Sequence, residues 1–211
     1  MNNIKVEILC ERPYNANTYF IKKDNLVILV DPANDIRSIK TMLKNEKLVG
    51  VLLTHGHYDH FKTLTKILNE YNIKCYMHKK AFLKLKNVDL SCARMFGCNV
   101  EEQIDEKQVQ YVNDGIVLDV EGIKIKCLYK PGHTDCSMIY IVDNLMFSGD
   151  FLFKEGIGRF DLPTSSSVVM NNSLREIIQF GKKQDYIVYP GHGESTTLFY
   201  ELKNNPYLIG K

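Results

Sequence analysis

The sequence predicts an α/β protein in which two β-sheets pack face to face and helices cover their outer sides. Runs with strand periodicity are followed by runs with helix periodicity twice along the 211 residues, which gives the chain two halves. Each half ends in helices, and stacking the two sheets with helices outside would bury every apolar face in four layers. No stretch rich in Pro, Gly or Ser separates the halves, so we expect a single domain over residues 1–211.

The first half is expected to begin with a strand and a hairpin and to continue with alternating helices and strands. Its strands have apolar residues at alternate positions or in continuous runs, and cover residues 4–9, 18–21, 26–30, 49–53 and 73–77. Its helices have apolar positions near one face, and cover residues 36–43, 61–68 and 79–85. Asn34 or Asp35 can cap the first of these helices. The run at 49–53 is apolar throughout, which is typical of a strand buried on both faces.

The second half is richer in strands and ends in two helices. Its strands are expected at residues 116–120, 123–128, 137–142, 145–147 and 186–189. Asp143-Asn144 is a suitable two-residue hairpin turn, and Ser165 to Ser167 can cap the first helix, which would carry Leu174 and Gly181. The last helix is expected to start near Ser195 or Thr196. Loops are expected at 13–17, 87–110, 149–163 and 190–194, of which 87–110 would include a helical turn.

Composition and charge exclude several classes of protein. The net charge is +2 and the lysines are scattered, whereas a nucleic-acid-binding protein gathers basic residues on one face. No apolar run approaches the roughly 18 residues that span a membrane. The six cysteines form no C-x-x-C pair and follow no export signal, so we expect free thiols, with Cys75 and Cys127 in the core, and a location in the cytoplasm.

The stretch from Thr54 to His60 concentrates groups that bind metal ions. It holds three of the six histidines, with an aspartate among them. Side chains two residues apart on an extended backbone point the same way, so His55 and His57 can converge on one metal ion. Asp59 and His60 lie where the chain turns into the next helix and can face a second position. Imidazole and carboxylate together favour zinc, iron or manganese over calcium or magnesium.

Three more potential ligands, His133, Asp150 and His192, each follow a predicted strand and a glycine that permits tight backbone. His78 also follows a strand but has no glycine or acidic residue beside it, and is expected to be structural. Asp31, at the end of strand 26–30, can support a metal ligand through a hydrogen bond or serve as a turn residue.

This set of residues resembles the metallo-β-lactamase fold superfamily, whose hallmark is H-x-H-x-D-H followed by a later His, Asp and His. The resemblance covers nearly the whole chain and implies a four-layer αββα sandwich of two mixed sheets flanked by helices. It also implies two divalent metal ions, with zinc expected first and iron or manganese as alternatives. One ion would be held by His55, His57 and His133. The other would be held by Asp59, His60 and His192. Asp150 would bridge the two ions, and Asp59 would orient the hydroxide between them.

A further segment narrows the resemblance within the superfamily. Gly149-Asp150-Phe151-Leu152-Phe153 and then Gly158-Arg159-Phe160-Asp161-Leu162-Pro163 resemble short bacterial hydrolases related to glyoxalase II. The resemblance implies hydrolysis of a small ester or thioester such as S-D-lactoylglutathione by the metal-bridging hydroxide. Arg159 would bind an anionic substrate group or, as we favour, pair with Asp161 to shape the loop. Only 19 residues follow His192, so the helical domain that binds glutathione in full-length glyoxalase II has no counterpart.

Two other functions are compatible with the same residues. A persulfide dioxygenase of this fold would hold one iron ion through His55, His133 and Asp150. A non-catalytic metal-binding module is the third alternative, although such members are expected to lose ligands and this chain retains all seven.

Overall fold

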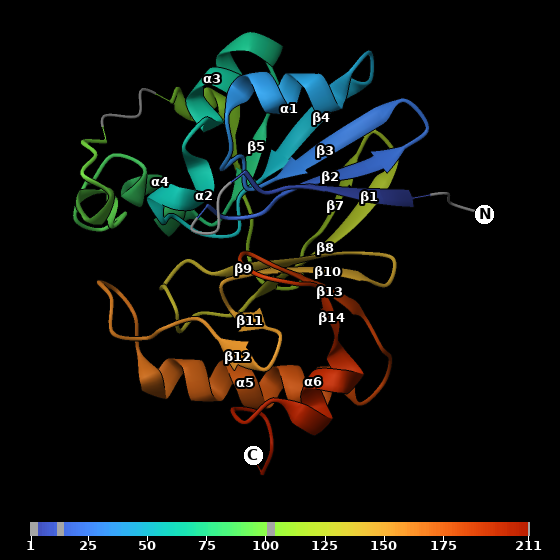
Figure 1. Cartoon of the computed structure of the whole chain (residues 1–211), viewed down its shortest axis with the longest axis vertical. Helices are drawn as coiled ribbons and strands as arrows, with labels where there is room; N and C mark the ends of the chain where they lie inside the picture. The colour runs from blue at the N-terminus through green and yellow to red at the C-terminus, as the bar shows by residue number, and fades with distance from the viewer. Residues whose placement is uncertain (1–3, 12–14, 101–103, 211) are drawn as a thin grey trace.

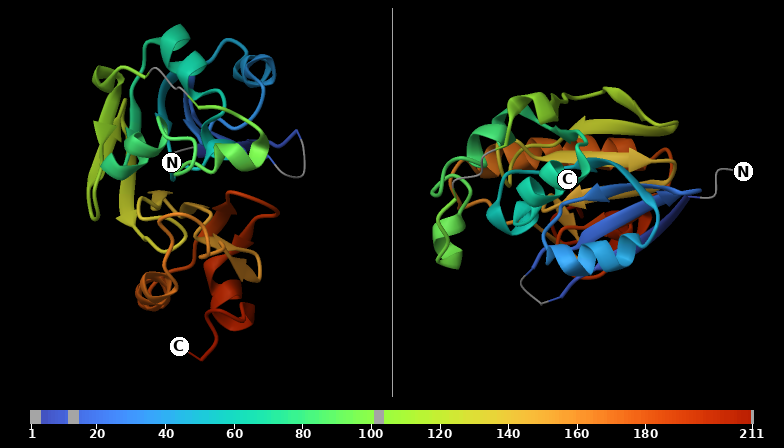
Figure 2. Two further views of the ribbon diagram at one scale, coloured as in Figure 1. Left: turned by 90° about the vertical axis from the view of Figure 1, so that its left-hand side faces the viewer. Right: turned by 90° about the horizontal axis from the view of Figure 1, so that it is seen from above.

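Two six-stranded sheets lie face to face, and helices cover the outer side of each sheet (Figure 1). The computed structural model describes residues 4–11, 15–100 and 104–210. A view turned by 90° again places α1 (Ile36–Leu43) and α3 (Leu64–Tyr71) at the end of the molecule opposite α5 (Ser167–Gly181) and α6 (Leu198–Asn204) (Figure 2). The predicted class, two mixed sheets flanked by helices in four layers, is therefore confirmed.

The first sheet is built from the amino-terminal half of the chain. Its strands, in spatial order, are β1 (Ile4–Leu9), β2 (Thr18–Lys23), β3 (Leu26–Val30), β4 (Lys47–Leu52), β5 (Cys75–Met77) and β6 (Val109–Tyr111). The first three strands pair antiparallel, and β3 to β6 pair parallel. The outer side of this sheet carries α1 (Ile36–Leu43), α2 (Tyr58–Phe61), α3 (Leu64–Tyr71) and α4 (Lys79–Lys84).

The second sheet is built from the carboxyl-terminal half. Its strands, in spatial order, are β14 (Thr196–Thr197), β13 (Ile187–Pro190), β10 (Leu145–Gly149), β9 (Met138–Val142), β8 (Ile123–Tyr129) and β7 (Val117–Val120). Its outer side carries α5 (Ser167–Gly181) and α6 (Leu198–Asn204). A separate two-stranded hairpin, β11 (Leu152–Phe153) and β12 (Gly156–Ile157), follows β10.

Three apolar clusters join the four layers. Alternate residues of both sheets meet in the middle, where Tyr19 packs edge-on against Phe147 with ring centroids 5.4 Å apart. A second cluster joins the first sheet to its helices, and a third joins the second sheet to α5 and α6. As predicted, Cys127 is fully buried in the middle cluster and Cys75 in the second, and none of the six cysteines forms a disulfide bond. Among the described residues, no helix combines the length and apolar composition needed to cross a bilayer.

Two helices differ in extent from the prediction. The single helix expected over 61–68 is divided into α2 and α3, because the amide and hydroxyl of Thr63 both donate to the carbonyl of Pro32, at 3.1 and 2.9 Å. The last helix begins at Leu198 rather than near Ser195 or Thr196. Thr196 instead pairs with β13, and Thr197 caps α6 by accepting a hydrogen bond from the amide of Tyr200.

The predicted loops contain secondary structure that was too short to show periodicity. Residues 87–110 include the 3₁₀ helices η1 (Ala93–Phe96) and η2 (Glu106–Gln108) and the start of β6. Residues 149–163 include the β11–β12 hairpin. Residues 13–14 of the expected loop at 13–17 and residues 101–103 of that at 87–110 lie outside the described residues.

Helix α5 is packed tightly against the loop that precedes His133. Gly132 has a φ of +145°, and a Cβ atom added there would lie 2.4 Å from Cα of Met170. The amide of Ser166 donates to the carbonyl of Gly132 at 2.9 Å. A side chain at position 132 would therefore push α5 away from the loop.

Gly132→Ala is expected to lower the free energy of unfolding by about 3 kcal/mol or more, because it adds steric overlap to an unfavourable φ. Gly115→Ala is the matched control: Gly115 also has a positive φ, +75°, but no described atom lies within 4 Å of an added Cβ. The control should cost about 1 kcal/mol. Urea unfolding of the metal-free protein measures both values, and equal losses would contradict the steric explanation.

Candidate metal centre

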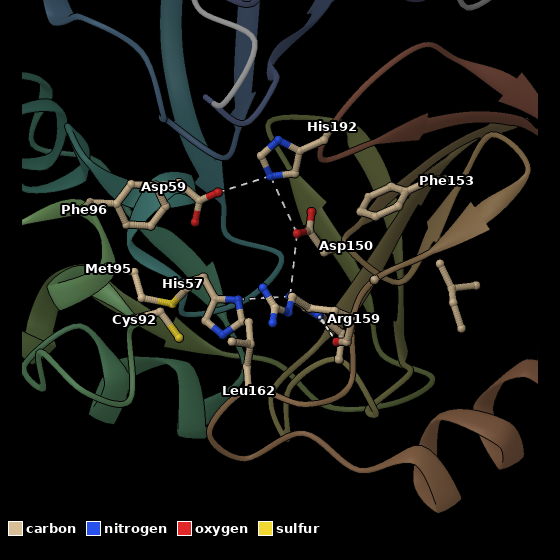
Figure 3. Close-up of a pocket in the computed structure, with 13 residues that line it drawn as sticks. His57, Asp59, Cys92, Met95, Phe96, Asp150, Phe153, Arg159, Leu162 and His192 are labelled. Atoms are coloured by element: carbon tan, nitrogen blue, oxygen red, sulfur yellow. Dashed lines mark hydrogen bonds and ion pairs between the residues drawn. The ribbon is translucent and has the colours of Figure 1, made fainter.

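The predicted ligands come together where strands of both sheets end. The stretch from Thr54 to His60 follows β4, whereas His133, Asp150 and His192 follow β8, β10 and β13. Asp59 and His60 lie on the short helix α2. The structure thus brings all seven predicted residues to one site between the halves of the chain. His57, Asp59, Asp150 and His192 are labelled in Figure 3.

The first group of side chains consists of three buried imidazoles. His55 Nε2 and His133 Nε2 lie 3.1 and 3.0 Å from His57 Nδ1. Each of the three residues is at least 96% buried. One nitrogen from each ring is within 4.8 Å of the others, which is close enough for a single ion to contact all three.

The second group consists of Asp59, His60 and His192. Nε2 of His192 lies 3.1 Å from Oδ2 of Asp59, and Nε2 of His60 lies 3.8 Å from the same oxygen. These three residues form another set whose ligand atoms lie within 4.8 Å of one another.

Asp150 lies between the two groups. Its Oδ2 is 3.6 Å from Nε2 of His133, and its Oδ1 is 3.2 Å from Nε2 of His60. A carboxylate has two oxygens and can contact two cations, whereas a neutral imidazole offers one lone pair to one cation. This arrangement agrees with the division predicted from the sequence, and metal binding by these residues remains a prediction.

Several polar atoms in the site lack hydrogen-bond partners. Within the described part of the chain, Nε2 of His57, Nε2 of His60 and Oδ1 of Asp150 are buried and make no hydrogen bond. Leaving such atoms unsatisfied costs about 1–3 kcal/mol each. Nε2 of His60 and Oδ1 of Asp150 lie 3.2 Å apart across the site. These two atoms indicate a site that is completed by a ligand, and a divalent cation fits this set of nitrogen and oxygen donors.

Burial sets the protonation of the first group. Burial lowers the pKa of His55 well below its ordinary value, lowers that of His133, and brings the pKa of His57 to about 3. These imidazoles are consequently neutral at pH 7 and present free lone pairs, as metal ligation requires.

The second group carries the charge of the site. Burial alone would lower the pKa of His60, but the carboxylates of Asp150 and Asp59 raise it well above its ordinary value. Conversely, burial opposes ionisation of Asp150, but its contacts with His60 hold its pKa well below the usual range. The metal-free site therefore pairs a protonated His60 with ionised carboxylates, and a cation would replace that proton.

Asp31 orients one of the candidate ligands. Its Oδ2 lies 2.8 Å from Nδ1 of His60 and accepts a hydrogen bond from the Thr54 hydroxyl at 2.6 Å. Its Oδ1 accepts from the amide of Thr54 at 2.8 Å. A carboxylate behind a histidine fixes the ring and leaves the other nitrogen free for a metal ion. Of the two roles considered for Asp31, this geometry favours support of a ligand.

Backbone contacts that the sequence did not reveal position two other histidines. The carbonyl oxygen of Arg159 lies 2.7 Å from Nδ1 of His133. In the loop that carries His192, the Asn17 side chain donates to the carbonyls of Pro190 and Gly193, each at 3.0 Å. These contacts involve carbonyl groups, which every residue type possesses, so no sequence motif marks them.

A cavity of about 440 Å³ opens onto the site. Five of the seven residues, all except His55 and His60, line this cavity, and the rest of the lining comes from the two loops at 87–110 and 151–165 (Figure 3). The first loop contributes Cys92, Met95 and Phe96, and the second contributes Phe153, Ile157, Gly158, Arg159 and Leu162. None of the apolar members was predicted, because an apolar residue in a loop carries no readable functional signal.

Arg159 and His78 occupy the structural roles that were favoured for them. The guanidinium of Arg159 lines the cavity but binds both carboxylate oxygens of Asp161, at 2.7 and 2.8 Å. His78 caps α4 by accepting from the amide of Lys80 and stacks on Tyr129 with centroids 4.7 Å apart. His78 is no part of the metal-binding groups formed by the described residues.

Comparison with known proteins agrees with this geometry. A probable metallo-hydrolase of Streptococcus pyogenes is 32% identical over 200 residues, which cover 90% of this chain and 84% of that protein. The hydroxyacylglutathione hydrolase GloC of Haemophilus influenzae is 27% identical, with coverage of 99% and 100%.

Two solved structures have the same fold over nearly their whole length. The BLEG-1 B3 metallo-beta-lactamase superposes with a TM-score of 0.89 at 27% identity, covering 98% of this chain and 100% of that one. The protein TTHA1623, in a di-iron-bound form, gives a TM-score of 0.83 at 25% identity, with coverage of 96% and 100%.

The family model described as the metallo-beta-lactamase superfamily matches residues 12–192, a range that includes all seven clustered residues. Together with the two sheets and the histidine–aspartate cluster at their edge, this match shows that the chain belongs to the metallo-beta-lactamase superfamily.

Proposed function

We propose that this protein is a hydrolase that uses two divalent metal ions to cleave a thioester. The observation that carries the proposal is the presence of two ligand groups joined by Asp150, in which Nε2 of His60 and Oδ1 of Asp150 are buried and make no hydrogen bond. Three protein ligands for each ion, plus a shared carboxylate, leave positions open for water and substrate, as catalytic metal sites require.

The choice of a thioester rests on relatives and on the sequence. The Haemophilus influenzae relative is named as a hydroxyacylglutathione hydrolase. The Gly149–Pro163 segment resembles that of short hydrolases related to glyoxalase II. S-D-lactoylglutathione is therefore the first substrate to assay, followed by thioesters of other thiols.

The chemistry requires water to attack the thioester carbonyl, so that a C–O bond forms, the C–S bond breaks and the thiol leaves with a proton. A pair of divalent ions supplies a water of lowered pKa and stabilises charge on the carbonyl oxygen. Asp59, held by His192, presents a carboxylate that can accept a hydrogen bond from the attacking water and fix its direction. We propose zinc first, whereas iron and manganese accept the same ligands.

The purified protein is expected to bind two metal ions per chain and to hydrolyse thioesters, with S-D-lactoylglutathione as the first one assayed. Elemental analysis of protein reconstituted with excess zinc, iron or manganese measures the first property, and release of free thiol measures the second. Removing the metal with a chelator should abolish activity, and adding it back should restore it. Fewer than two ions at saturation, together with no thiol release from any thioester, would refute the proposal.

Replacing Asp59 with Asn in the metal-loaded protein is expected to lower kcat about 100-fold or more, since an amide cannot accept the proton that a carboxylate accepts. Metal content must be measured on the same sample. Asp24→Asn, at an exposed turn, is the control and should leave kcat unchanged. An unchanged kcat in Asp59→Asn with both ions bound would contradict the role given to Asp59.

Asp31→Asn is expected to weaken metal binding about 10- to 100-fold, because the neutral amide no longer supports the His60 ring as a carboxylate does. Competition with a chromophoric chelator measures this affinity without reference to activity. Asp24→Asn again serves as the control. An effect limited to folding stability, with metal affinity unchanged, would contradict the orienting role of Asp31.

The alternative function, a persulfide dioxygenase, would use a subset of the same residues to hold one iron ion. Nε2 of His133 and Oδ2 of Asp150 lie 3.6 Å apart, close enough for one ion to contact both. Oxygen uptake with glutathione persulfide separates the two functions. We expect no uptake by the iron-loaded protein, and uptake without thioesterase activity would favour the dioxygenase.

A further inference from the structure

The cavity beside the metal centre is walled by apolar side chains. Met95 and Phe96 lie on the side of Asp59, and Phe153 lies across the cavity beside His192 (Figure 3). Cys92, Ile157 and Leu162 complete the walls. Apart from the seven clustered residues, the lining contributed by the described chain contains no Ser, Thr, Asn, Gln or Tyr.

Positive charge in the lining is already neutralised. Arg159 is the single Lys or Arg among the lining residues of the described chain. Both of its contacts with Asp161 are short, and the two side chains form a planar pair. An anionic or hydrogen-bonding substrate group entering the cavity would have to compete with Asp161 for this guanidinium.

The wall that contains Phe153 and Ile157 is held in place from behind by α6. Glu201 is fully buried; its Oε2 accepts hydrogen bonds at 2.8 Å from the amide of Glu155 and from the Asn205 side chain. The Asn205 side chain in turn donates to the carbonyl of Gly156 at 3.0 Å. These hydrogen bonds fix the turn of the β11–β12 hairpin, so the apolar wall is already formed before substrate binds.

We propose that the protein selects thioesters whose acyl group is a short, uncharged, apolar chain. The inference rests on the proposed thioesterase function and refines its substrate class. The walls flank the metal centre on both sides, so both substituents of a carbonyl at that centre meet apolar surface. An apolar chain is favoured by removal from water. A polar group of the same shape would lose hydrogen bonds to water and find no polar side chain in the apolar walls to replace them.

Two thioesters of N-acetylcysteamine, a small uncharged thiol, provide a matched test. Their acyl groups are 4-methylpentanoyl and 4-amino-4-oxobutanoyl, which have the same branching and the same number of non-hydrogen atoms. The second ends in a primary amide, whose lack of charge avoids attraction to the metal ions. We expect kcat/KM for the apolar thioester to be at least tenfold higher, and equal values or the reverse order would overturn the inference.

Variants of the walls test whether the preference arises there. Met95→Gln and Ile157→Thr introduce a polar atom at little change in size and should each reduce the ratio of the two kcat/KM values at least threefold. Met95 is 64% exposed, so this variant is expected to fold normally. Leu83→Gln is the control, because Leu83 is 62% exposed and lies outside the cavity. A ratio that stays unchanged in both wall variants would contradict the assignment.

Binding of unreactive analogues separates this inference from the proposed function. The 4-methylpentyl and 4-amino-4-oxobutyl thioethers of N-acetylcysteamine have no carbonyl to attack, and NMR titration of the zinc-loaded protein measures their affinities. Tighter binding of the apolar thioether, by at least fivefold, supports the preference for apolar groups. If no thioester is hydrolysed in the same study, the proposed hydrolase function is refuted while this preference still holds. Equal binding overturns the inference even if both thioesters are hydrolysed.

Discussion

The structure depends on holding seven polar side chains together where little water reaches them. Five imidazoles and two carboxylates meet at the ends of strands from both sheets. Removing such groups from water is unfavourable unless each finds a partner. The fold supplies partners on the outer side of the cluster, through Asp31 behind His60 and the Arg159 carbonyl behind His133. The inner side, where Nε2 of His60 and Oδ1 of Asp150 make no hydrogen bond, is left for a ligand.

The position of the cluster follows from chain topology. Strands β3 to β6 run parallel, as do β10 and β13, so the loops at their carboxyl ends gather at one edge of each sheet. Packing the sheets face to face brings those two edges together. Close approach is permitted by Gly191, where an added Cβ would lie 2.1 Å from Oδ1 of Asp150. Neither half of the chain alone contains a complete set of ligands.

Much of this arrangement could be predicted from the sequence, since polar residues at the ends of apolar strands are easy to recognise. The long strands and the caps at Asp35 and Ser166 were recognised by periodicity and by residue type. The hairpin β11–β12 was missed because two-residue strands have no period. The division of the helix at Thr63 depends on the carbonyl of Pro32, a contact between segments that no local pattern reports. The individual apolar residues of the cavity walls, such as Met95, could not be identified in advance, because a loop residue acquires a role only from its neighbours in space.

Because the ligands are distributed over both halves of the chain, the stability of the folded protein would depend on the concentration of free metal ions around it. An unfolded chain cannot present His55, His133 and His192 at one point, so ions held as proposed would bind the folded state almost exclusively. Under that condition, each tenfold rise in free metal concentration above the dissociation constant adds about 1.4 kcal/mol per site to the free energy of unfolding. The concentration of free metal would then set the fraction of protein that is folded as well as the fraction that is catalytically active.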